Sequence, residues 1–63
     1  MDLTIRNFHK TIINSAVQKL DRKLTEKEKI FITSREGFVA LEMILDTVRA
    51  ETKENIEKYL NSE

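Results

Sequence analysis

Residues 38–45 constrain the fold more than any other part of the chain. They read Phe-Val-Ala-Leu-Glu-Met-Ile-Leu, so apolar side chains would occupy nearly every side of a helix, with Glu42 as the exception. A helix that is apolar all round is buried all round, and one helix packed against it covers only one stripe. We therefore expect other copies of the chain to cover this stretch.

The length of the chain points in the same direction. Its 63 residues form a single helical domain, residues 1–63, and a chain of about 60 residues buries only about 60 % of the surface that its unfolded form exposes. Small proteins compensate with disulfides, a metal or association. With no cysteine and one histidine, disulfides and ordinary zinc sites are excluded. We expect a homo-oligomer without a metal or other cofactor.

Helical patterns run along most of the sequence and predict an all-α protein. Proline is absent and glycine occurs once, so strong helix breakers are nearly missing. Residues 2–22 repeat apolar side chains at spacings of three and four, which is typical of a helix with one buried face. Thr25 and Glu28 have the spacing of a capping box, which predicts that a second helix begins near residue 26.

The sequence leaves the extent of this second helix open. Thr33 and Glu36 form a second possible capping box, and a break near Thr33 would give three helices. Gly37 inside a helix costs only about 1 kcal/mol. Heptad spacing also relates five residues of this region: Phe31, Phe38, Leu45, Thr52 and Tyr59. We favour one helix from residue 26 to about 60, and hence an antiparallel hairpin of two long helices assembled as a homo-oligomer.

The expected oligomer interface combines the apolar stretch with the flanking heptad positions. Its candidates are Phe31, Phe38, Val39, Leu41, Met43, Ile44, Leu45 and Val48. Charge favours association as well. Residues 1–29 carry seven Lys or Arg against four Asp or Glu, and residues 30–63 carry four against seven. The two halves, with net charges of +3 and −3, should attract each other within a copy or between copies.

Several function classes are disfavoured. His9 is the only obvious general base, and no serine–histidine–acid order, glycine-rich phosphate loop or metal-ligand spacing accompanies it, so we expect no catalysis. No apolar run approaches the roughly 20 residues that span a bilayer, and no signal peptide pattern opens the chain. Balanced overall charge argues against a general nucleic-acid coat. These features predict a soluble, cytoplasmic protein.

Two groups of residues are candidates for ligand binding. A basic cluster spans the end of the first helix and the start of the second, and it consists of Lys19, Arg22, Lys23, Lys27 and Lys29. It is either a solvated turn whose charges complement the helix dipoles or a contact for a phosphate or an acidic partner; in the second case Arg22 and Lys23 are the binding residues. Arg35 precedes Gly37 and Phe38, an arrangement that could hold a phosphate and stack a base, although an exposed surface arginine is the simpler interpretation.

Residues 33–41, Thr-Ser-Arg-Glu-Gly-Phe-Val-Ala-Leu, resemble a stretch of the phage-encoded sponge proteins that sequester cyclic nucleotide signals of bacterial immunity. In that family the second helix of a helical hairpin carries a Gly-Phe-Met-x-Leu stretch, and compact oligomers bind cyclic oligonucleotides without cleaving them. Val39 stands here in place of the family's Met, and Met43 in place of a basic residue. The resemblance implies that Arg35, Gly37 and Phe38 contact the ligand, in a host cytoplasm.

Three functions follow as expectations. The first is a non-catalytic oligomeric binding protein that sequesters a small anionic signal such as a cyclic nucleotide, with a phage anti-defence role. The second is a helical hairpin that regulates or inhibits a host protein by docking onto it. The third is a small DNA-binding protein, which is disfavoured because the second helix is apolar or acidic and poor in Arg, Asn and Gln.

Overall fold

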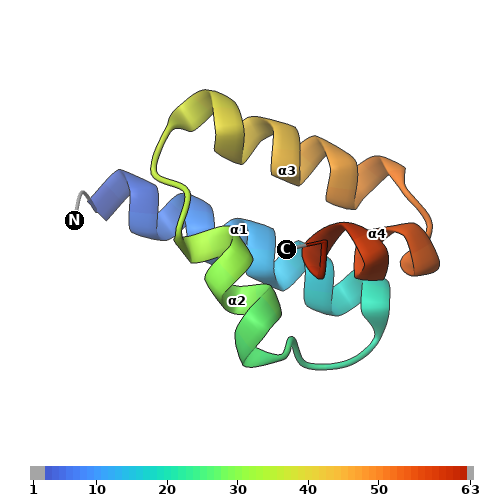
Figure 1. Ribbon diagram of the computed structural model, residues 1–63. Coiled ribbons are helices and arrows are strands. Elements are labelled where there is room, and N and C mark those ends of the chain that lie inside the picture. The colour runs from blue at the N-terminus through green and yellow to red at the C-terminus, as the bar shows by residue number, and fades with distance from the viewer. Residues whose placement is uncertain (1–2, 63) are drawn as a thin grey trace.

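The computed structural model describes residues 3–62, and within them it contains four α-helices and no strand. The helices are α1 (Leu3–Leu20), α2 (Glu26–Thr33), α3 (Phe38–Ala50) and α4 (Lys53–Leu60) (Figure 1). The prediction of an all-α fold is confirmed.

The expectation of one helix from residue 26 to about 60 is wrong, because the chain breaks near Thr33 and again after Ala50. The hydroxyl of Thr33 donates to the carbonyl of Lys29 within α2, so it does not cap a new helix. Gly37 is the N-cap of α3 and makes no side-chain capping bond. The second break was not predicted, and it occurs where Thr52 caps α4 by accepting from the backbone N–H of Asn55. Because the helix is interrupted twice, the heptad positions from Phe31 to Tyr59 do not line up along one side of a single helix.

The first helix and the first turn follow the sequence pattern closely. The buried residues of α1 recur every three or four positions: Ile5, His9, Ile12, Ala16 and Leu20. α1 ends at Leu20 because Asp21 has a positive φ of 56°, a conformation that Asp tolerates better than most residues and that terminates a helix. The predicted capping box of Thr25 and Glu28 is confirmed in both of its hydrogen bonds.

The direction of each helix follows from contacts at its ends. The rings of Phe8 and Phe38 lie 6.3 Å apart near the beginnings of α1 and α3. Lys19 reaches the carbonyl of Glu51 near the ends of the same two helices, so α1 and α3 run in parallel, as Figure 1 shows. α2 must therefore bring the chain back along α1 before α3 begins, and α4 turns back after α3 toward α2.

One hydrophobic core lies among the four helices. Each helix contributes at least two side chains that are nearly inaccessible to solvent, and the turn before α2 adds Leu24. The core residues are Ile5, Ile12, Ala16, Leu20, Leu24, Phe31, Ile32, Leu41, Ile44, Val48, Ile56 and Leu60. A single copy therefore covers one side of the apolar stretch 38–45 with its own helices.

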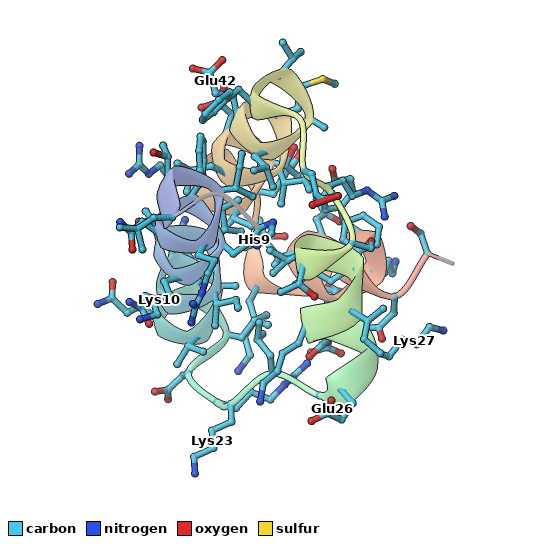
Figure 2. All side chains as sticks on the ribbon, turned by 90° about the vertical axis from the view of Figure 1, so that its left-hand side faces the viewer. His9, Lys10, Lys23, Glu26, Lys27 and Glu42 are labelled. Atoms are coloured by element: carbon cyan, nitrogen blue, oxygen red, sulfur yellow. The ribbon has the colours of Figure 1, made fainter. Side chains whose placement is uncertain are left out.

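His9 lies inside this core, facing the connection between α2 and α3. It is only 4 % exposed, and its Nε2 lies 2.6 Å from the carbonyl oxygen of Arg35. Because a carbonyl can only accept, the Nε2–H of His9 donates this bond. Figure 2 shows His9 in the middle of the molecule. This hydrogen bond connects residues 34–37 to α1. The buried ring of His9 is therefore a structural donor for the connection.

Replacement of His9 by Leu is expected to lower the free energy of unfolding by about 1–3 kcal/mol, because the Arg35 carbonyl then loses its buried donor. His9→Gln should recover part of that loss, since its side-chain amide can donate from a similar position. Urea denaturation followed by circular dichroism measures both variants. Equal losses for Leu and Gln would mean that the ring's packing, and not its hydrogen bond, holds the connection.

Candidate functional site

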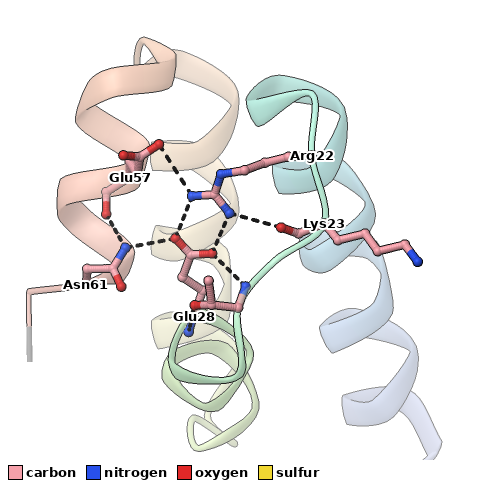
Figure 3. Close-up of polar contacts among 6 residues, drawn as sticks. Arg22, Lys23, Glu28, Glu57 and Asn61 are labelled. Carbon is pink, nitrogen blue, oxygen red and sulfur yellow. Dashed lines mark hydrogen bonds and ion pairs between the residues drawn. The ribbon is translucent and has the colours of Figure 1, made fainter.

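Arg22 and Glu28 form the centre of the most extensive polar network in the described chain (Figure 3). The two guanidinium nitrogens Nη1 and Nη2 of Arg22 lie 2.9 Å from the two carboxylate oxygens of Glu28. Glu28 is fully buried, and its carboxylate also accepts from the backbone N–H of Thr25 at 2.9 Å. A buried carboxylate with this many donors is well satisfied.

The same network reaches α4 (Figure 3). The side-chain amide of Asn61 donates to Glu28 at 2.8 Å, and Arg22 pairs with Glu57 at 3.3 Å. The network therefore joins the α1–α2 turn, the first turn of α2 and the end of α4. Its polar groups bond to one another, so the network holds these three segments together, and both Nη atoms of Arg22 are engaged within the copy.

The network sets the charge state of Glu28. The hydrogen bond from Arg22 is the largest cause that lowers the pKa of this carboxyl from 4.5 to about 2, against the opposing effect of burial and with help from Thr25 and Asn61. The same pair raises the pKa of Arg22 further above its already high ordinary value. Glu28 thus stays ionised throughout the neutral and mildly acidic range.

We expect this ionisation to make stability depend on pH. The pKa of Glu28 is lower in the folded chain than its ordinary value, so its contribution is complete above pH 4.5 and is lost as the pH falls toward about 2. The loss should amount to about 1–2 kcal/mol, less than the full shift implies because Arg22 and Glu57 are partly in solvent. Urea denaturation at a series of pH values measures it, and Glu28→Gln should flatten the curve in this window.

The residues expected to contact a ligand are not gathered in one place. Arg35 packs its guanidinium 4.4 Å from the centre of the Phe31 ring and donates to the carbonyl of Phe31 and the hydroxyl of Ser34. Lys23 lies in the turn before α2, at the other end of that helix (Figure 2). Eight residues of helix separate the two groups by about 12 Å. Within one copy, Arg22 and Lys23 do not join Arg35, Gly37 and Phe38.

Gly37 does not lie inside a helix, because it is the N-cap of α3. Its φ of −83° is available to every residue. A Cβ added there would meet nothing within 4 Å, so no neighbouring group approaches closely. The positions of Gly37 and of the half-exposed Phe38 are therefore compatible with an open surface.

The eight expected interface residues divide into two sets. Phe31 is 7 % exposed and lines a hollow on the surface. Leu41, Ile44 and Val48 are buried inside the single copy, at 2 % exposure or less, so a second copy cannot reach them and their assignment to an interface needs correction. The reason is that α1 covers the side of α3 that the sequence left without a partner. Phe38, Val39 and Met43 are 51 %, 72 % and 63 % exposed, and Leu45 is partly buried.

One face of α3 combines apolar and acidic side chains. Val39, Glu42, Met43 and Asp46 are all exposed, and their spacing of three, four and seven residues places them on one side of the helix. We call these four residues the α3 outer face. Figure 2 shows Glu42 at the edge of the molecule that α3 forms. Glu42 was noted as the polar exception of residues 38–45, whereas Asp46 was not singled out, although its helical spacing from Val39 is visible in the sequence.

Two hollows lie elsewhere on the surface. One, of about 380 Å³, is lined by Ser15, Gln18, Lys19 and Arg49 between α1 and α3. The other, which we call the α2–α4 hollow, has a volume of about 190 Å³ and is lined by Lys27, Ile30, Phe31, Ser34 and Leu60. Phe31 and Leu60 are buried and form its floor, whereas Ile30 is 60 % exposed at its rim. Of these residues, only Lys27 and Phe31 were singled out from the sequence.

Among residues 3–62, no three His, Cys, Asp or Glu side chains lie close enough together to hold a metal ion. None of the four helices has the length and hydropathy needed to cross a membrane. Comparison of the chain with protein-family models, curated proteins and solved structures finds no match. The geometry of the candidate sites is therefore the only basis for proposing a function.

Proposed function

We propose that this chain is a non-catalytic protein-interaction module that docks onto its partner through the α3 outer face. The observation that carries the proposal is the exposure of Val39 and Met43, one helical turn apart, in a copy whose remaining helices already cover the opposite side of α3. Exposed apolar surface rimmed by polar side chains is typical of a protein interaction site. Glu42 and Asp46 on the same face favour a partner surface that is apolar and basic.

The environment of His9 supports a role without catalysis. The chain has no other histidine, and this one is buried and bonded to a backbone carbonyl. A general base must reach the proton that it abstracts, and a ring enclosed among core side chains is poorly placed to do so. The charge of the α3 outer face also disfavours a DNA-binding role, because Glu42 and Asp46 would face phosphate groups of the same sign.

A photo-crosslinking amino acid placed at position 43 tests the proposal in cells that express the protein. Adducts with a defined protein species should form from position 43 and not from position 14, an exposed site on α1 that serves as the matched control. Asp46→Lys should reduce their yield, since it reverses one of the acidic charges. Equal yields at both positions, or no adducts at position 43, would contradict a docking role for this face.

Capture of a small anion is a second candidate function, supported by the hollow between α1 and α3. Lys19 and Arg49 place two cations beside Ser15 and Gln18, the donor types that bind phosphate. Both cations also lie in the last turns of their helices, where they complement the negative helix ends. Calorimetric titration with cyclic di- and trinucleotides tests this candidate, with Lys19→Ala/Arg49→Ala as the comparison; absence of heat from the unmodified protein would reject it.

A further inference from the structure

The α3 outer face and the α2–α4 hollow are complementary in shape and in apolar character. The first is a convex helix surface from which Met43 projects, 63 % exposed. The second is a depression of about 190 Å³ with an apolar floor of Phe31 and Leu60. A water molecule occupies about 30 Å³, so the depression holds several waters that an apolar side chain could displace. Methionine is unbranched and flexible and adapts to such irregular spaces.

The charges of the two surfaces are complementary as well. Glu42 and Asp46 flank Met43 on α3, and Lys27 lines the hollow on α2. Among residues 3–62, none of these three charged side chains forms an ion pair with another. Opposite charges around a central apolar contact favour the correct docking orientation and speed association.

The two surfaces lie on opposite sides of the molecule. Figure 2 shows Glu42 at the top, at the outer edge of α3, and Lys27 at the lower right, beside α2. One copy therefore cannot bring its own α3 outer face to its own hollow. A second copy can supply the missing surface.

We propose that the partner of the α3 outer face is the α2–α4 hollow of a second copy of this chain. The inference rests on the proposed function, since it names the partner of the same face. Because the two surfaces lie on different sides of a copy, one pair of copies makes the contact only once, so the contact is heterologous and leaves one α3 outer face and one hollow free in each pair. Further copies can therefore add to either free surface, and growth does not stop at a dimer. The contact involves few side chains and is reversible and dependent on concentration.

Sedimentation equilibrium from micromolar to millimolar concentration tests the assembly. The mean mass of the unmodified protein should rise steadily with concentration and reach no plateau at a dimer. Met43→Lys and Ile30→Lys should each weaken association by about tenfold or more, because each places a charge at the centre of the contact. Both positions are more than half exposed, so the variants should fold, and their thermal unfolding midpoints verify this. Asn14→Lys adds the same charge at an exposed position of α1 and should leave the mass curve unchanged.

A mixing experiment distinguishes this contact from a symmetric one that joins two like surfaces. Met43→Lys retains its hollow and Ile30→Lys retains its α3 outer face, so an equimolar mixture should form dimers that grow no further, although each variant alone is monomeric. Similarly, Glu42→Lys and Lys27→Glu should each weaken assembly of the single variant, and the double variant should restore it. A mixture that stays monomeric would overturn the proposal.

The result also separates this inference from the proposed function. An unmodified protein that remains a single copy at millimolar concentration overturns self-association through the hollow. If position 43 nevertheless crosslinks to a different protein in cells, the interaction module stands with another partner. If position 43 forms no adduct either, both proposals fail.

Discussion

Leu41→Ala is expected to lower the free energy of unfolding by about 2–5 kcal/mol, because it removes most of a side chain that is fully buried between α3 and α1 and leaves a cavity. Proteins are stable by roughly 0.05–0.15 kcal/mol per residue, so this chain of 63 residues has only about 3–9 kcal/mol to lose. The variant should therefore lose roughly half of its stability or more. Circular dichroism with urea denaturation measures the change.

Val39→Ala is the matched control for this experiment. Val39 lies two residues from Leu41 but is 72 % exposed on the α3 outer face, and exposed substitutions usually change stability by less than about 0.5 kcal/mol. The sequence assigned both residues to the oligomer interface, and the pair of variants separates burial within one copy from contact between copies. A stable Leu41→Ala variant that merely loses self-association would show that Leu41 acts between copies, contrary to its burial in one copy.

The second large effect is expected from Glu28→Ala, which should cost about 2–4 kcal/mol. The substitution removes the acceptor for the backbone N–H of Thr25 and for Arg22 and Asn61. A helix cap contributes about 1 kcal/mol and hydrogen bonds to a charged group about 1.5–3 kcal/mol. Since three parts of the chain meet at this carboxylate, the α1–α2 turn and the end of α4 should both loosen.

Glu26→Ala provides the comparison, because Glu26 belongs to the same first turn of α2 but is exposed. Urea denaturation gives the loss of unfolding free energy for each variant. The difference between the two losses is the contribution of the buried network beyond that of any acidic side chain in the first turn of a helix. Arg22→Met forms a third arm, in which the pKa of Glu28 should rise and the acid transition should move to higher pH. Equal stability of the Glu28 and Glu26 variants would contradict the structural role of the network.

Local features of the fold could be predicted because their causes are local. The spacing of the apolar residues from Ile5 to Leu20 determines which side of α1 is buried. The capping box of Thr25 and Glu28 depends on two residues three positions apart, and it forms as expected. The same spacing rule failed at Thr33, whose hydroxyl bonds back to Lys29, because a residue that can begin a helix can also bond within the preceding one.

Only the tertiary structure decided which apolar residues of α3 are covered and by what. The sequence by itself determined an all-α chain, the buried side of α1 and the start of α2, since helical periodicity and capping act over a few residues. It did not determine the break at residues 34–37, which is accompanied by the bond from His9 to the Arg35 carbonyl across 26 positions of sequence. Nor did it separate Leu41 from Val39, because a run of apolar residues contains no information on the direction from which a distant helix packs. That direction leaves Val39 and Met43 in solvent beside Glu42 and Asp46.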